Sequence, residues 1–129
     1  MPYKVSYDEQ NKIVVARVFG VATPEDHSSA QEESFRLCRE KNSLRVLVDL
    51  KDLDTRLSTT LSSFGSGERT AEADIPALTR IAYITPKDPK SAEDLKFATT
   101  VAANRGRIIR LFDSAEQAQQ WLLEAAVHA

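Results

Sequence analysis

The sequence has very few of the residues that build most catalytic and metal centres. It contains one cysteine, Cys38, and two histidines, His27 and His128, among 129 residues. A single cysteine excludes a disulfide within the chain and a cysteine-rich metal site, and it suits a reducing compartment. No two of these residues lie within one helical turn of each other, so the spacing of zinc ligands is missing as well. We therefore expect no catalytic residue, no metal ion and no cofactor.

The chain also lacks an excess of charge of one sign and a long apolar run. Seventeen Lys and Arg against nineteen Asp and Glu give a net charge of −2, with nine against ten in residues 1–64 and eight against nine in residues 65–129. Nucleic-acid binding favours a basic region, which neither half provides. No apolar run approaches the roughly 20 residues of a membrane span, and the polar start Met1–Lys4 is unlike a signal peptide. We expect a cytoplasmic protein with no nucleic-acid partner and no transmembrane segment.

What the sequence does contain is the composition of a folded domain. Hydrophobic residues make up 42% of the chain and charged residues 28%. These fractions are ordinary for soluble proteins and unlike those of disordered chains. A length of 129 residues fits one compact domain. We therefore predict a single domain over residues 1–129.

Strands and helices alternate along most of the chain. Runs of β-branched and apolar residues predict five strands, at residues 3–7, 12–19, 44–50, 80–85 and 108–112. Helical spacing predicts four helices: at residues 24–41, at about 58–72, after the loop at Pro86 and Pro89 to near residue 104, and from 115 onward. The first two strands form a hairpin, and the helix after them makes the third strand parallel to the second. The order β-β-α-β-α-β-α-β-α predicts an α/β fold with a single mixed, mostly parallel five-stranded sheet and helices on its faces.

Three helix ends carry recognisable capping residues. In the segment Thr23–Asp26, a threonine stands at the N-cap, a proline at the first helical position and acids in the first turn. Ser114–Gln117 has the spacing of a capping box. Gly106 is placed to take the left-handed conformation after the third helix.

The first predicted helix carries the cysteine and one histidine. Cys38 shares an apolar stripe with Ala30 and Leu37, so we interpret it as a small buried hydrophobe. His27 falls in the first turn of this surface helix, and His128 lies near a terminus where disorder is common. We expect both imidazoles to be solvated.

The segment after the predicted third strand is the best-placed candidate site. In open α/β sheets, ligands and partners bind beyond the carboxyl ends of the strands. Residues 54–60 form the long, hydroxyl-rich segment there. Hydroxyls at a helix N-terminus are well placed for phosphorylation, because a phosphate meets free N–H groups and a favourable dipole. Plain N-capping by Ser58 is the alternative for that residue, and a carboxylate Mg²⁺ site at Asp49, Asp52 and Asp54 is an alternative to a solvated acidic loop.

Three segments resemble a known superfamily. The element order and the phrase Val46–Leu53 resemble the STAS/SpoIIAA-like superfamily, whose third strand ends in a similar apolar-Asp-Leu phrase. The opening Tyr3–Asp8 and the segment Ala102–Gly106 are similar to small stand-alone bacterial SpoIIAA-like, STAS/CRAL-TRIO-like proteins, over essentially the whole chain. Anti-sigma-factor antagonists of this superfamily carry an Asp-Ser-Ser-Gly loop whose first serine is phosphorylated by a partner kinase. That acceptor falls on Ser58, while the Asp and Gly positions hold Leu57 and Thr60.

The resemblance implies a non-catalytic regulatory or interaction module that engages a protein partner through the loop and helix after the third strand. The alternative, implied by the CRAL-TRIO lipid carriers, is a carrier or sensor of a small apolar, lipid-like ligand behind a mobile wall; the competing interpretation is that the apolar residues of this helix fill the core. An antiparallel strand at a sheet edge offers pairing groups, which leaves a homodimer open. The candidate partner- or ligand-binding residues are Asp49, Asp54, Thr55, Ser58, Thr59, Leu61 and Phe64, with Ser58 as the candidate phosphoacceptor.

Overall fold

The chain begins with an antiparallel hairpin at one edge of a sheet. In this computed structural model, which describes residues 2–54 and 74–124, β1 (Tyr3–Asp8) pairs with β2 (Ile13–Val18). The register places Tyr3 opposite Val18 and Asp8 opposite Ile13. The Asp8 carboxylate closes the turn by accepting the backbone N–H groups of Gln10 at 3.1 Å and Asn11 at 3.2 Å, a typical role for aspartate in turns.

Three further strands extend the sheet in chain order. β3 (Arg45–Asp49), β4 (Arg80–Ile84) and β5 (Ile108–Phe112) give the order β1-β2-β3-β4-β5, and every pair after the hairpin is parallel. The mixed, mostly parallel five-stranded sheet predicted from the sequence is therefore confirmed. The helix predicted near residues 58–72 lies outside the described residues.

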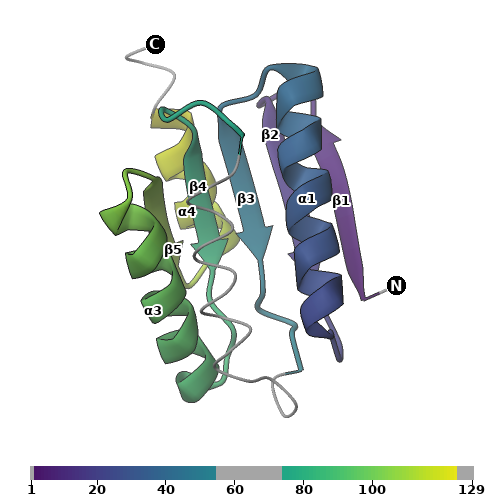
Figure 1. The fold of residues 1–129 in the computed structure, drawn as a ribbon, viewed down its shortest axis with the longest axis vertical. Helices are drawn as coiled ribbons and strands as arrows, with labels where there is room; N and C mark the ends of the chain where they lie inside the picture. Colours follow the sequence, from purple (N-terminus) through teal and green to yellow (C-terminus); the bar gives the residue numbers. More distant parts are fainter. Residues whose placement is uncertain (1, 55–73, 125–129) are drawn as a thin grey trace.

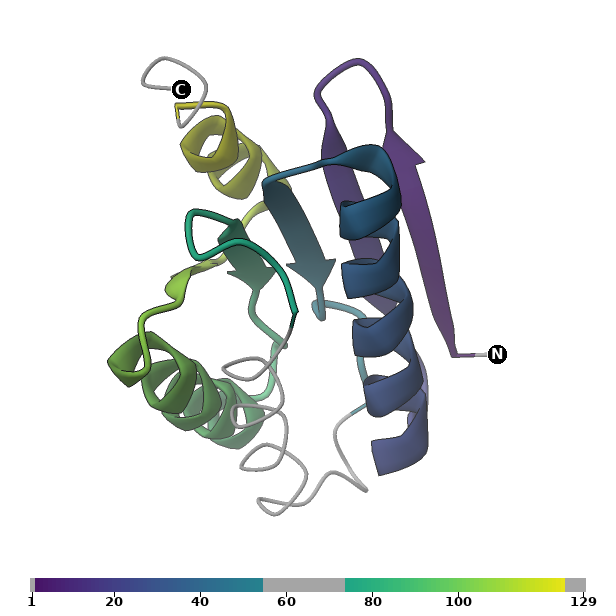
Figure 2. The same ribbon diagram turned by 45° about the horizontal axis from the view of Figure 1, so that its top comes forward.

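Helices cover both faces of the sheet. α1 (Pro24–Lys41) and α3 (Pro89–Asn104) lie on one face, and α4 (Ala115–Glu124) lies on the other (Figures 1 and 2). α1 joins β2 to β3 and α3 joins β4 to β5, so two right-handed crossovers in the same direction bring both helices to one face. α4 follows the last strand and is free to take the opposite face. None of the described helices combines the length and apolar character of a membrane span.

The predicted helix caps are present. The Thr23 hydroxyl accepts the N–H of Asp26 at 3.1 Å, and the Asp26 carboxylate accepts the N–H of Thr23 at 2.8 Å, which makes a reciprocal capping box. The Ser114 hydroxyl accepts the N–H of Gln117 at 3.3 Å at the start of α4. After α3, Gly106 has a φ of +98°, a conformation that favours glycine.

The sheet separates two clusters of buried side chains. The cluster on the α1 face includes Val14, Val46 and Cys38, and the one on the α4 face includes Ile13 and Leu122. Cys38 is 2% exposed, which confirms its interpretation as a buried hydrophobe. Burial raises the pKa of its thiol to about 11, so the thiol stays protonated at neutral pH and is a poor nucleophile.

Candidate functional site

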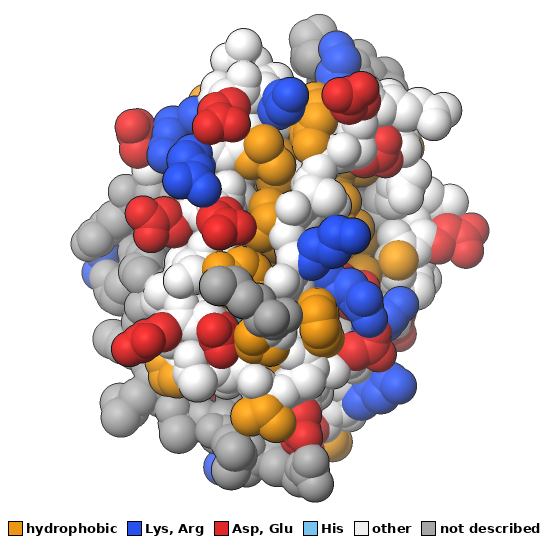
Figure 3. Space-filling view, turned by 90° about the vertical axis from the view of Figure 1, so that its right-hand side faces the viewer, with side chains coloured by type: hydrophobic (Ala, Val, Ile, Leu, Met, Phe, Trp, Pro, Cys, Tyr) orange, Lys and Arg blue, Asp and Glu red, His pale blue; other side chains and the backbone are white. Residues whose placement is uncertain are grey.

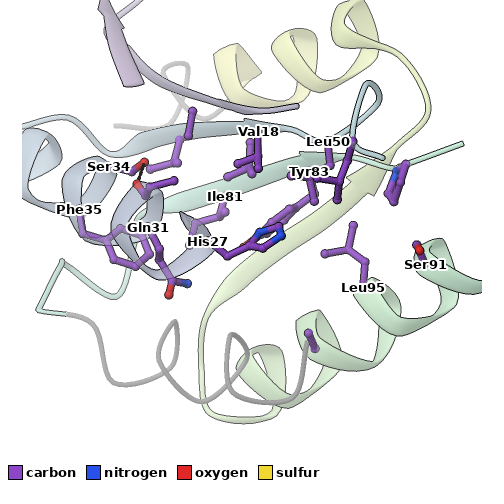
Figure 4. A pocket seen from close by; sticks show the side chains of 17 residues that line it. Val18, His27, Gln31, Ser34, Phe35, Leu50, Ile81, Tyr83, Ser91 and Leu95 are labelled. Carbon is purple, nitrogen blue, oxygen red and sulfur yellow. Dashed lines mark hydrogen bonds between the residues drawn. The ribbon is translucent and has the colours of Figure 1, made fainter. Parts of the chain in front are cut away.

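A cavity of about 90 Å³ lies on the face of the sheet that carries α1 and α3 (Figure 4). Its described lining comes from β2, β3, β4, the two helices and the segments after β3 and β4. About 10–15 Å³ suffices for one water molecule, so this space is large enough for a small organic group. Within the described parts of the chain, we take this space as the candidate ligand site.

Alternate residues of parallel strands form the floor of the cavity. Val46 and Val48 of β3 stand in register with Ile81 and Tyr83 of β4, and all four line it. Side chains two apart on a strand point to the same face, so the register aligns these side chains in two rows. Val46 is 0% and Ile81 1% exposed. The floor is therefore branched aliphatic surface with one phenol ring.

The wall on the α1 side follows from helical spacing. His27, Ala30, Gln31, Ser34 and Phe35 line the cavity at intervals of three and four residues. Ala30 and Ser34 are almost fully buried. The hydroxyl of Ser34 donates to the carbonyl oxygen of Ala30 at 2.6 Å, so its hydrogen bond stays within the helix and its outer surface adds little polarity.

The wall on the α3 side begins at the helix N-terminus. Asp88 is the N-cap, and its carboxylate accepts both the N–H of Ser91 at 3.1 Å and the hydroxyl of Ser91 at 3.0 Å. Leu95 and Ala98 continue the lining along the same face of α3. Ser91 therefore both lines the cavity and fixes the first turn of α3.

The position of His27 corrects the interpretation made from the sequence. We expect a solvated imidazole, but the side chain is half-buried and lines the cavity, and Figure 4 shows it extending from α1 into the space between the two helices. The available signal was its spacing of three and seven residues from Ala30 and Ser34, which places it on the buried stripe. His128 lies outside the described residues.

Two of the predicted site residues are described, and neither lines the cavity. Asp49 ends β3, is 9% exposed, and accepts the N–H of Lys51 at 3.0 Å with one carboxylate oxygen while the other lies 3.9 Å from the Lys51 ammonium. The N–H of Asp54 donates to the carbonyl oxygen of Gly20 at 2.8 Å. The remaining predicted residues lie outside the described part of the chain; these are Thr55, Ser58, Thr59, Leu61 and Phe64.

The same segment contributes to the cavity through residues that the sequence interpretation missed. Leu50 and Leu53 line it, and the two residues between them, Lys51 and Asp52, are exposed. The apolar character of the two leucines between Asp49 and Asp54 was the available signal. The structure therefore divides this segment into an apolar side, which faces the cavity, and an acidic side.

The acidic side of this segment is partly neutralised. Arg17 donates to the Asp52 carboxylate at 2.9 Å, and this hydrogen bond lowers the pKa of Asp52. The Arg17 guanidinium also lies 5.0 Å from the centre of the Phe19 ring. Within residues 2–54 and 74–124, no three His, Cys, Asp or Glu side chains are grouped so as to hold a metal ion.

Comparisons with known proteins give a fold and no function. No protein-family model matches the chain, and no curated protein gives a significant match. Among solved structures, the chain is similar to an uncharacterized protein from the DUF3478 family with a SpoIIAA-like fold, from Shewanella loihica PV-4. The TM-score is 0.51 at 17% sequence identity, covering 93% of this chain and 91% of that one. An identity this low supports the fold alone, so the chain has a SpoIIAA-like α/β fold.

Proposed function

We propose that this protein is a non-catalytic binding protein that holds a small apolar molecule, or the apolar end of a lipid-like one, between α1 and α3. The observation that carries the proposal is the cavity over Val46 and Ile81, with its walls from α1 and α3. Ligand sites are typically concave and mostly apolar, with a few polar groups that fix orientation. An apolar cavity of this kind binds water poorly and apolar guests well.

The hydrogen bonds of the two lining serine hydroxyls support binding over catalysis. A nucleophilic serine needs a base within hydrogen-bond distance and a group that orients the base. The Ser34 hydroxyl donates to a helix carbonyl, and the Ser91 hydroxyl donates to the Asp88 carboxylate that caps the helix. Both hydroxyls are thus engaged in helix geometry. His27 and Gln31 add hydrogen-bonding groups at one side of the cavity, which suits a ligand with one polar end.

Native mass spectrometry of protein purified from its host tests the proposal directly. We expect a reproducible additional mass of lipid or other small-molecule size that is lost on denaturation. A clean mass of the unliganded chain under gentle ionisation contradicts carriage of a tightly held ligand.

A titration of isotope-labelled protein with 1-hexanol tests the cavity itself. We expect saturable amide shift changes that centre on the cavity walls in α1 and α3 and leave α4 unchanged. Ala98→Leu, which fills the cavity from α3, should abolish these changes. Ala103→Leu is the matched control, because Ala103 is exposed on the same helix. Equal responses in the two variants contradict binding in the cavity.

A regulatory module that engages a protein partner is the second candidate function. It is favoured by the segment after β3, where Leu50 and Leu53 line the cavity while Lys51 and Asp52 are exposed. A ligand that moves the leucines would shift the neighbouring charged side chains. In this way the loop would report cavity occupancy to a partner.

Interaction experiments separate this second function from simple carriage. Titration of a candidate partner against the labelled chain should shift amides in residues 49–54, and the reversal Asp52→Lys should weaken that binding. The Arg17–Asp52 pair is exposed, so this change should leave the fold intact. Shifts confined to α4 or β5 would refute this docking site.

A further inference from the structure

The outer edge of β1 is the second feature that calls for an explanation. β1 is an end strand of the sheet, and no described strand pairs with its outer side. Figure 3 shows this side of the molecule, where an apolar band runs between groups of charged side chains. An uncovered strand edge is a template for another strand.

The pairing with β2 determines which backbone groups of β1 face outward. The N–H of Phe19 donates to the carbonyl oxygen of Pro2 at 2.9 Å, in continuation of the antiparallel register. Hydrogen-bonded and non-hydrogen-bonded positions alternate along an antiparallel pair. Lys4 and Ser6 therefore direct their N–H and C=O groups toward β2. Tyr3, Val5 and Tyr7 direct theirs to the free edge.

The side chains of β1 are complementary to those of a second, antiparallel β1. When two copies are centred on Ser6, Lys4 of each stands opposite Asp8 of the other, and Val5 stands opposite Tyr7. Val5 and Tyr7 both have outward N–H and C=O groups, so their backbones can form hydrogen bonds in this register. Opposite charges and aromatic–β-branched pairs are favourable across strands, and a two-fold axis repeats each contact.

We propose that two copies of this chain associate through their β1 strands, antiparallel about Ser6, into one continuous sheet. Tyr3, Val5 and Tyr7 pack against the cluster on the α1 face, so the Val5–Tyr7 contacts extend that cluster from one copy to the next. Lys4 and Ser6 are exposed on the opposite side of β1. The charge pairs therefore form on the face away from α1.

The charges also select among registers. A pairing centred on Val5 also joins outward backbone groups, Val5 with Val5 and Tyr3 with Tyr7, but it places Lys4 opposite Ser6 and Asp8 opposite Pro2. The Asp8 carboxylate accepts hydrogen bonds from Gln10 and Asn11 within its own turn, so these bonds are the same in either register. The register about Ser6 therefore gains two ion pairs that the other lacks.

Sedimentation velocity over protein concentrations from about 5 to about 500 µM tests the association. We expect a monomer–dimer equilibrium that shifts toward monomer with added salt. Lys4→Glu turns both attractive pairs into repulsive ones and should weaken the dimer about tenfold. Lys96→Glu, the same reversal at an exposed position of α3, is the matched control and should leave it unchanged. A monomer throughout, or equal effects of the two variants, overturns the proposal.

Backbone measurements test the strand pairing independently of charge. The amide hydrogens of Val5 and Tyr7 should exchange more slowly at high protein concentration than at low, while the exchange of a control amide within α3, that of Lys96, should not change. Val5→Pro removes an outward N–H without removing a bond to β2, and prolines are tolerated on edge strands. It should abolish the dimer while circular dichroism and cooperative unfolding persist. A dimer that survives Val5→Pro, or exchange that is independent of concentration, refutes pairing through β1.

Discussion

The substitution Ala98→Leu gives the sharpest test of the cavity. The sign of its effect on the free energy of unfolding depends on whether there is space beside Ala98. Ala98 is 4% exposed on α3 and lines the cavity. Leucine adds three carbon atoms, and each buried methylene contributes roughly 0.8 kcal/mol. A side chain that enters a cavity of about 90 Å³ should therefore stabilise the unliganded protein by up to about 2 kcal/mol.

If the space beside Ala98 were already filled, Ala98→Leu would destabilise the protein. Insertion of extra methylenes into a well-packed core costs about 1–3 kcal/mol, because side chains leave their rotamers and the backbone shifts. Ala102 provides this comparison, since it lies one turn further along α3, is 1% exposed and does not line the cavity. Ala102→Leu should therefore destabilise the fold. The change in helix propensity is the same at both positions and cancels from the comparison.

Urea unfolding of the wild type and both variants measures the difference. The predicted result is a higher midpoint for Ala98→Leu, a lower midpoint for Ala102→Leu, and equal slopes. Equal destabilisation by the two variants would refute the reasoning, since it would show that Ala98 faces packed atoms. Stabilisation of Ala98→Leu with full retention of 1-hexanol binding would place the guest elsewhere.

Two further predictions concern single side chains on α1. Thr23→Ala removes the N-cap acceptor and half of the reciprocal bonds with Asp26, so it should cost about 1 kcal/mol in urea unfolding, whereas the exposed control Thr100→Ala should cost little. Burial raises the pKa of Cys38 from 9.0 to about 11, so the folded state keeps a proton that the unfolded chain loses. Relative to Cys38→Ala, the free energy of unfolding of the wild type should fall by roughly 1.4 kcal/mol per pH unit between pH 9 and 11, and it should not change below pH 8. A pH-independent difference between these two proteins would contradict the raised pKa.

Much of the fold was predictable because its signals are local. Branched apolar runs located the strands, and residues with strong positional preferences marked the helix ends, as Thr23, Ser114 and Gly106 show. The parallel arrangement followed from connectivity, since a helix between two strands of one sheet requires a crossover. Each inference used neighbours in sequence or a general chiral rule, and neither depends on how side chains fit together.

The cavity was not predictable, because it depends on packing between distant segments. Val46 and Ile81 are far apart in sequence and meet only through the register of β3 with β4. His27 was expected in solvent because a first-turn position usually is exposed, yet tertiary packing brings α1 over the sheet and turns that residue toward the cavity. Leu50 and Leu53 were overlooked beside the more conspicuous acids. Side-chain volume, which periodicity does not report, decides whether such a stripe is filled or leaves space.

The positions of both proposed surfaces follow from the distribution of helices over the sheet. α1 packs on β1 and β2 and reaches β3, while α3 packs on β5, so the cavity over β3 and β4 lies between two helices that are fixed by their own crossovers. On the other face, α4 packs on β3, β4 and β5, which leaves the polar side of β1 exposed. Because the strands follow one another in chain order, the apolar floor of the cavity lies at the centre of one face, between α1 and α3. The same order leaves β1 as an edge strand. The two surfaces share no residue, so Ala98→Leu and Lys4→Glu should act on ligand binding and self-association separately.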